Sequence, residues 1–258
     1  MLHKRFFVFS SICFWLSGCA TDKPSEQWVN LFNGNDLTNW TVKINHHKVG
    51  ENYGNTFRVE DGLLKVRYDQ YEFNDEFGHL FYNTPFDNFH LRLDYRFIGE
   101  FEEGAPSYAR LNSGVMFHSQ SPRSINLDQN WPISVEMQFL ADTGDGSRFT
   151  GSMCSPGTDV VYAQKIYPEH CLPSNFKALT KEQWVHAELI VKQNTITHMI
   201  NGEVVLQYSR PTIDGKDGIV VGQSPEYKEH GKILQSGYIG LQSEGQPIEF
   251  KNIIIRRL

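Results

Sequence analysis

The sequence predicts an all-β protein, built as an antiparallel β-sandwich or jelly roll. Three observations lead to this prediction. Apolar and polar residues alternate at a period of two along much of the chain, and turn pairs such as Asn201-Gly202 separate the alternating runs. No stretch longer than about ten residues shows a helical period.

The first residues (1–18) have the pattern of a lipoprotein signal peptide. Lys4 and Arg5 precede an apolar run from Phe6 to Leu16, which is too short to span a membrane. The run ends in LSGC, the pattern of a bacterial lipobox, in which Cys19 receives the lipid. We therefore expect a lipidated tether over 19–28 and a protein held by its lipid alone in the bacterial cell envelope, at the periplasmic or outer-membrane face.

The remaining residues (29–258) are expected to form a single jelly-roll domain. They are numerous enough for one large β domain, and no internal linker is evident. The formal charge of −6 becomes −8 once Lys4 and Arg5 leave with the signal peptide. Since the chain has no basic stripe, nothing favours nucleic acid as a partner.

The alternating runs are expected to be the strands. In FHLRLDYRF (89–97), for example, the apolar side chains share one face and the polar side chains share the other. The expected strands, in order, are 56–68 with a turn at Asp61-Gly62, 89–97, 113–119, 133–140, 184–193, a hairpin over 194–208 that turns at Asn201-Gly202, 237–244 and 247–258. Two long connections, 142–179 and 210–236, are expected to be functional loops beside a pocket.

The cysteines predict one disulfide. Cys13 leaves with the signal peptide and Cys19 takes the lipid, so Cys154 and Cys171 remain as a pair. In an oxidising envelope they are expected to form a bridge that orders the first long loop. A catalytic thiol and half of a metal site are the alternatives.

The run ISVEMQF (133–139) places a carboxylate and an amide in the middle of an apolar strand. Glu136 and Gln138 share one face with Ser134, whereas the apolar residues share the other. A half-solvated strand explains this pattern, and so does a strand whose polar face opens into a binding site.

Several motifs together resemble the 3-keto-disaccharide hydrolase family from about Val29 to Leu258. They are LFNGNDLTNW, NSGVMFHSQ, PISVEMQFL, TGSMCSPGTDVVY, HMINGE and GYIGLQSEGQPIEFKNIIIRRL. The resemblance implies a concanavalin A-like jelly roll with a concave sugar-binding face. It also implies an enzyme that cleaves sugars oxidised to a ketone at carbon 3, by elimination or hydrolysis. Many members close with LQ-x-HG, whereas this chain has LQSEG, with Glu244 at the position of the histidine.

In this fold Glu136 and Gln138 would point into the sugar groove. The strand offers no second carboxylate, so double-displacement glycosidase chemistry is disfavoured on it. Cleavage of a 3-keto sugar needs only one carboxylate, because the ketone acidifies the hydrogen on carbon 2 and a single base can remove it. We therefore expect Glu136 to be the base, His118 or Arg148 to stabilise the enolate, and Gln138 to bind sugar hydroxyls. His118 is equally well a structural histidine, and Arg148 could pair with an aspartate of its own loop.

Other candidates for substrate binding are Asn112, His198, Gln242 and Glu244. His198 could instead be a strand residue beside its hairpin, and Glu244 is a second candidate for an acid or a cation ligand. Asp142 and Asp145 of DTGDG are candidate calcium ligands, and a turn explains them equally well. A non-catalytic, lectin-like carbohydrate-binding lipoprotein is the alternative to an enzyme, because one fold supports both functions.

Overall fold

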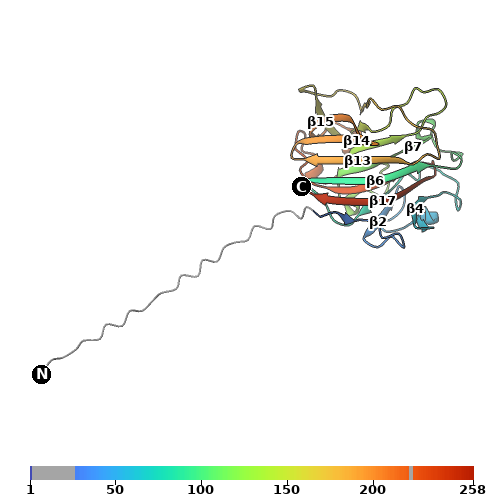
Figure 1. Ribbon diagram of the computed structural model, residues 1–258, viewed down its shortest axis with the longest axis horizontal. Coiled ribbons are helices and arrows are strands. Elements are labelled where there is room, and N and C mark those ends of the chain that lie inside the picture. Colours follow the sequence, from blue (N-terminus) through green and yellow to red (C-terminus); the bar gives the residue numbers. More distant parts are fainter. Residues whose placement is uncertain (2–26, 221–222) are drawn as a thin grey trace.

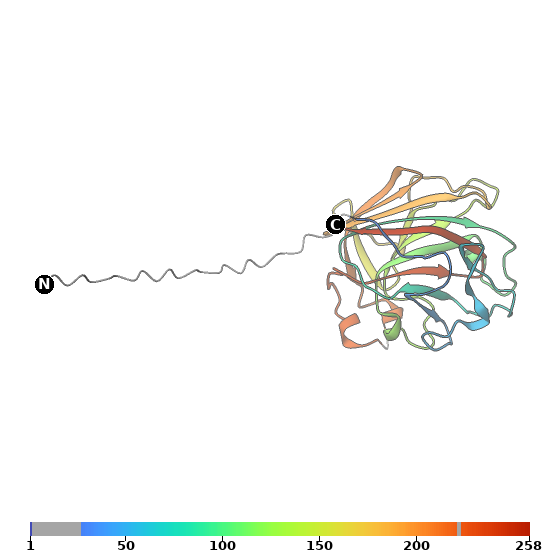
Figure 2. The ribbon, with the colours of Figure 1, turned by 60° about the horizontal axis from the view of Figure 1, so that its bottom comes forward.

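Two antiparallel β-sheets lie against each other (Figure 1 and Figure 2), which confirms the predicted antiparallel β-sandwich, a jelly roll. This computed structural model describes Met1, residues 27–220 and residues 223–258. The predicted signal peptide and the lipidated Cys19 lie outside the described residues.

The described elements are strands and short 3₁₀ turns, in agreement with the all-β prediction. The strands are β1 (Val29–Asn30), β2 (Trp40–Ile44), β3 (Phe57–Glu60), β4 (Leu63–Val66), β5 (Gly78–Tyr82), β6 (Phe89–Phe97), β7 (Asn112–Ser119), β8 (Val135–Leu140), β9 (Ser152–Cys154), β10 (Thr158–Tyr162), β11 (Lys165–Ile166), β12 (Cys171–Leu172), β13 (Val185–Lys192), β14 (Thr195–Ile200), β15 (Glu203–Ile213), β16 (Tyr238–Ser243) and β17 (Ile248–Arg257). The 3₁₀ turns are η1 (Tyr53–Asn55), η2 (Ser107–Ala109), η3 (Pro122–Ser124), η4 (Gly218–Val220) and η5 (Pro225–Tyr227).

The larger sheet has ten strands in the order β11-β10-β15-β14-β13-β6-β17-β4-β3, and β1 pairs with β17. The smaller sheet has seven strands in the order β12-β9-β8-β7-β16-β5-β2. Figure 1 looks onto the larger sheet, and Figure 2 shows the second sheet as a separate layer beneath it. The smaller sheet carries the strands expected to bear the site, β7, β8 and β16.

The core lies between the sheets and consists of the apolar faces predicted from alternation. In β8, Val135, Met137 and Phe139 are buried in this core. The ring of Phe139 stacks on Tyr95 of the opposite sheet with centroids 4.0 Å apart. Glu136 and Gln138 consequently point away from the core, because side chains alternate along a strand.

The predicted hairpin turns are confirmed. Asn201 and Gly202 have φ angles of 51° and 85°, and Asp61 and Gly62 have 55° and 74°. Two consecutive left-handed residues match the twist of the flanking strands, and Asn-Gly and Asp-Gly tolerate this conformation best.

The prediction of a long loop over 142–179 was wrong in part, because β9, β10, β11 and β12 lie within it. These strands have two to five residues, too few for a period of two to be recognised. Strands β2 and β5 were also not predicted. Each has five residues, and each buries a polar side chain, Lys43 or His79, that a sequence pattern would assign to solvent.

No helix among the described residues is both long and apolar enough to cross a membrane.

Candidate functional site

A cavity of about 920 Å³ opens on the face of the smaller sheet that points away from the core. Its floor comes from β7, β8 and β9, and its walls come from the connections around 108, 126–131 and 170, from 217–219 and from Gln223. The described residues that line it are Tyr108, Asn112, Asn126, Asp128, Gln129, Asn130, Trp131, Glu136, Gln138, Cys154, Pro156, His170, Cys171, Asp217, Gly218, Ile219, Gln223 and Glu244.

Glu136 lies at the centre of the floor because of the strand register. It pairs with Met116 of β7 on one side and with Cys154 of β9 on the other. Space for its carboxyl group comes from Gly114, since a Cβ atom there would lie 2.3 Å from Oε1 of Glu136. Any side chain at this position would displace the carboxyl group.

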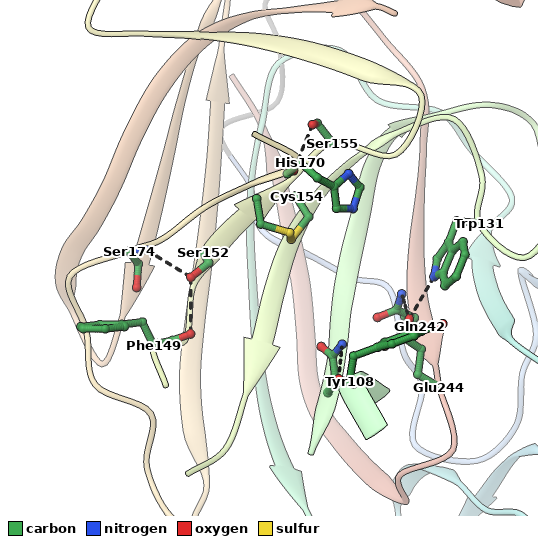
Figure 3. Close-up of a disulfide and its surroundings, with 12 residues drawn as sticks. Tyr108, Trp131, Phe149, Ser152, Cys154, Ser155, His170, Ser174, Gln242 and Glu244 are labelled. Atoms are coloured by element: carbon green, nitrogen blue, oxygen red, sulfur yellow. Dashed lines mark hydrogen bonds between the residues drawn. A yellow bond between two sulfur atoms is a disulfide. The ribbon is translucent and has the colours of Figure 1, made fainter. Parts of the chain in front are cut away.

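Glu244 follows β16 directly and supplies a second carboxyl group to the same cavity. Its Oε1 accepts hydrogen bonds from Nε1 of Trp131 at 2.9 Å and from Nε2 of Gln242 at 3.2 Å. Figure 3 shows Tyr108, Trp131, Gln242 and Glu244 grouped beside the disulfide. The second carboxylate that the strand 133–140 lacks therefore comes from the residue that follows another strand, β16.

The two carboxyl groups have different electrostatic surroundings. Burial raises the pKa of Glu136 well above its ordinary value, and the nearby Glu244 raises it further. Burial raises the pKa of Glu244 to about 7, and the hydrogen bond from Trp131 opposes this shift. Among the described residues, no basic side chain forms an ion pair with either group. Both therefore hold protons far more readily than surface glutamates do.

Four buried oxygen atoms at this site have no hydrogen-bond partner among the described residues. They are Oε1 of Glu136, Oε2 of Glu244, Oε1 of Gln242 and Oδ1 of Asn112. Buried polar atoms in folded proteins are nearly always paired with protein or water. A polar ligand rich in hydroxyl groups would satisfy them.

Three glutamine side chains join the walls of the cavity. Gln129 donates to Oε1 of Gln120 at 3.0 Å, Gln223 donates to Oε1 of Gln129 at 2.7 Å, and Gln120 donates to Oε1 of Gln223 at 3.3 Å. Gln129 also donates to the carbonyl of Trp131 at 2.8 Å. This ring of hydrogen bonds is here called the glutamine triangle. It holds in place the wall that carries Trp131, which donates to Glu244.

The predicted disulfide between Cys154 and Cys171 is confirmed, with an S–S distance of 2.06 Å. The two residues are direct partners on β9 and β12, and both line the cavity with His170. Although potential ligand atoms of these three residues lie within 4.8 Å of one another, the bridged sulfurs are not thiolates.

A second cluster that could hold a metal ion, Asp159, Asp214 and His230, contains none of the predicted site residues. Asp142 and Asp145, the calcium candidates, accept hydrogen bonds from the backbone N–H groups of Gly146 and Ser147. This is how aspartates stabilise a turn.

The structure brings together five of the eight predicted site residues. Glu136, Gln138, Asn112 and Glu244 line the cavity, and Gln242 contacts Glu244.

The other three predicted residues, His118, Arg148 and His198, lie outside the cavity lining. His118 was expected to share a face with Gly114 and Met116, but its φ of 47° interrupts the alternation of β7. It is buried, and burial lowers its pKa to about 4.

Arg148 and His198 have structural partners. Nη1 of Arg148 donates to the carbonyls of Arg110, Ala141 and Leu111 at 2.7, 3.2 and 3.4 Å, so this guanidinium joins backbone segments. The ring nitrogens of His198 contact the carbonyl of Gly151 and the hydroxyl of Tyr208 in the core. Neither side chain therefore lines the cavity.

Sequence reasoning missed the residues of the cavity walls, of which Tyr108 and Trp131 are the main examples. Tyr108 is 55% exposed at the mouth of the cavity, and Trp131 immediately precedes the PISVEMQFL motif. A large aromatic residue in a loop next to a candidate strand is the signal that could have identified Trp131.

Comparison with known proteins decides the family. Residues 27–256 match the family model described as the 3-keto-alpha-glucoside-1,2-lyase-like domain. The chain belongs to this family. The family resemblance inferred from the motifs is thereby confirmed, and the match extends across both sheets and the cavity.

Similar solved structures share the fold of this family member at low sequence identity. Two are structures of proteins from Parabacteroides distasonis ATCC 8503 proposed to be glycosyl hydrolases. One is 19% identical, covers 90% of this chain and 94% of its own, and has a TM-score of 0.54. The other is 20% identical, covers 90% and 100%, and also has a TM-score of 0.54. The laminarinase from Rhodothermus marinus is 8% identical, covers 90% and 96%, and has a TM-score of 0.50. A search among curated proteins finds no match.

Proposed function

We propose that this protein is a carbohydrate-active enzyme that cleaves 3-keto-glycosides by elimination of the group on carbon 1. The single observation that carries this proposal is the pair of buried carboxyl groups, Glu136 and Glu244, which share one cavity without a cationic partner among the described residues. The family membership and the unpaired polar atoms around the pair support a sugar as the ligand.

The surroundings of the pair assign its roles. Glu244 accepts two N–H donors, which stabilise its ionised form, and its pKa of about 7 lies near neutrality. Oε1 of Glu136 has no donor among the described residues, and burial and the nearby Glu244 both raise the pKa of Glu136. Where two environments push carboxyl pKa values apart, the group with the lower value is the base and the other is the acid. We therefore assign Glu244 as the base and Glu136 as the acid, which reverses the sequence-based expectation for Glu136.

The proton transfers of the proposed elimination need only these two groups. Glu244 takes the proton from carbon 2, and the electron pair of that C–H bond forms the double bond between carbons 1 and 2. The C1–O glycosidic bond breaks, and its oxygen leaves as an alcohol with the proton of Glu136. Addition of water across the new double bond, with the two carboxyl groups in exchanged roles, yields the free 3-keto sugar and restores both protonation states.

Negative charge develops on the ketone oxygen as the proton leaves carbon 2. Since Arg148 and His118 lie elsewhere, amide N–H groups are the available donors, and Asn112 and Gln138 carry them on the cavity floor. Preorganised neutral donors of this kind can supply several kcal/mol.

Incubation of the domain with a series of 3-keto-glycosides, followed by measurement of the released alcohol, tests the proposed activity. We expect release from 3-keto-glycosides and none from the matched unoxidised glycosides, which lack the acidic hydrogen. Deuterium at carbon 2 should slow the release if proton transfer limits the rate. Tight binding without release, across several leaving groups, would support the lectin-like alternative instead.

We further propose that the enzyme acts in the bacterial cell envelope as a lipoprotein. The support is the sequence pattern alone, with its apolar leader and the LSGC motif that ends at Cys19. Labelling of cells with a radioactive or alkyne-bearing fatty acid should mark the wild-type protein and leave the Cys19→Ala variant unlabelled.

A further inference from the structure

The cavity that holds Glu136 and Glu244 is acidic. Asp128 and Asp217 also line it, so four carboxyl groups surround one volume of about 920 Å³. Among the described residues, neither lysine nor arginine contributes to the lining. The nearby Lys43 lies outside the lining and donates to the backbone carbonyls of Ile44 and Leu127, and Asp128 is the lining carboxylate with which its charge interacts.

The four carboxyl groups differ in how their charge is compensated. Asp128 accepts a contact from Nδ1 of His46 at 2.8 Å. Asp217 accepts the backbone N–H groups of Gly157 and Ile219 at 3.1 and 2.9 Å. Glu244 is buried and has no ion-pair partner among the described residues, so the charge it carries when ionised acts most directly on a ligand.

The groups that face Glu244 are acidic or neutral. Glu136 lies close enough for the two carboxyl groups to interact, and the phenols of Tyr108 and Tyr68 lie close enough for Glu244 to raise their pKa values. Trp131 and Gln242 contribute uncharged N–H groups. None of these groups would offset an anion on the ligand.

We propose that this site accepts uncharged sugars and rejects sugars that carry a carboxylate or a phosphate on the reacting ring. The inference rests on the proposed function, because a ring whose carbons 1 and 2 are positioned between Glu136 and Glu244 cannot hold its other substituents far from both. A carboxylate on carbon 6 would thus enter the field of an ionised, unpaired glutamate in a partly desolvated cavity. Neutral glucosides satisfy the unpaired buried atoms without this repulsion.

An NMR titration with methyl glucoside and methyl glucuronide of the same anomeric form tests the proposal without chemistry, since neither sugar has the 3-ketone. At pH 8 we expect the glucoside to bind at least about tenfold more tightly than the glucuronide. At pH 5.5 the difference should shrink, because Glu244 takes up a proton while the carboxylate of the sugar stays ionised. The Glu244→Gln variant should show a small difference at both pH values.

Glu249 is also a buried glutamate, but it pairs with Arg67 and Arg96 on the other sheet, so Glu249→Gln is the matched control. This variant should keep the pH-dependent difference of the wild type. Equal affinities for the two sugars at pH 8, a difference that persists in Glu244→Gln, or loss of the pH dependence in Glu249→Gln would each overturn the proposal. Failure of both sugars to bind would overturn the glycoside site itself. Turnover of a 3-keto-glucuronide as fast as a 3-keto-glucoside would overturn only the charge selection.

Discussion

Glu136 and Glu244 lie in one cavity, but they receive different hydrogen bonds. Trp131 and Gln242 donate to Glu244, and no described group donates to Oε1 of Glu136. The pair can therefore hold one proton near neutral pH, which is the state that an acid and a base acting together require.

At the residue scale, the Glu136→Gln variant separates catalysis from folding. It keeps the shape of the side chain but removes the acidic proton, so we expect turnover to fall by at least about a hundredfold. The free energy of unfolding should stay constant or rise. Burial of a carboxyl group destabilises the folded state, and burial of the neutral amide destabilises it less. Thermal unfolding and turnover measured on the same variant check both expectations.

Glu249→Gln is the matched control, since Glu249 is equally buried but pairs with Arg67 and Arg96 on the other sheet. It should lower stability by about 1–3 kcal/mol and leave the activity per folded molecule intact. A marked loss of stability in Glu136→Gln, with intact activity, would contradict the catalytic role of Glu136.

Glu244 should make both activity and stability depend on pH. Its pKa rises from the ordinary value of 4.5 to about 7 on folding, so between these values the native state binds more protons than the unfolded state. Stability should therefore fall as the pH rises from 4.5 to 7, by about 3 kcal/mol for a shift of this size. Activity should rise as the pH passes the pKa of Glu244, about 7, because the base must be ionised. Denaturant unfolding and turnover at several pH values test this, and Glu244→Gln should lose the stability component.

At the scale of elements, two sets of contacts between elements hold the site in place. The glutamine triangle joins the wall that carries Trp131 to the segment around Gln223, and the disulfide joins β9 to β12. Each lies beside the cavity and outside the main core, so each can be weakened without unfolding the sheets.

Gln129→Leu should loosen the wall and weaken the bond from Trp131 to Glu244. Since that bond lowers the pKa of Glu244, the rise of activity with pH should move to higher pH. Trp131→Phe, which removes the donor directly, should produce the same shift. Unchanged pH profiles in both variants would show that the triangle does not act through Trp131.

Replacing both Cys154 and Cys171 by serine should destabilise the protein by about 3 kcal/mol, as expected for a bridge that closes a loop of this length, with a sequence separation of 17. The sheets should persist in circular dichroism, because the bridge joins β12, at the edge of the smaller sheet, to its neighbour β9 and does not hold the other strands. Free-thiol counting on the denatured wild type, without reductant, should give no thiol; a count near two would contradict the bridge.

At the scale of the whole molecule, the two sheets are held together by aromatic residues from both layers. Phe139 of β8 stacks on Tyr95 of β6, and the hydroxyl of Tyr95 contacts Oγ1 of Thr150 at 2.7 Å. Phe139 neighbours Gln138 but points to the opposite face, so it supports the cavity floor from beneath.

Phe139→Ala should cost about 3–5 kcal/mol of stability, because it removes a buried ring and leaves a cavity between the sheets. Denaturant titration measures this loss. The conservative Phe139→Leu should cost less, and recovery of activity at low temperature in both variants would confirm that the ring supports the fold and not the chemistry. A cost below about 1 kcal/mol for Phe139→Ala would contradict the packing argument.

The sequence by itself determined the fold class, the two hairpin turns, the cysteine pair and the outward face of Glu136 and Gln138. These features depend on local periodicity, on turn residues that tolerate left-handed backbone, or on simple counting, so nearby residues suffice to specify them. The family resemblance also came from the sequence, because several motifs agree in order along the chain.

Only the tertiary structure decided the composition of the site. Glu136 and Glu244 are far apart in the chain, and it is the pairing of β7 with both β8 and β16 that brings their strands together. The interrupted alternation at His118, the carbonyl partners of Arg148 and the core position of His198 likewise depend on contacts that no local pattern encodes. Protonation states depend on burial and on neighbours in space, so the roles proposed for Glu136 and Glu244 could be argued only when both were placed in one cavity.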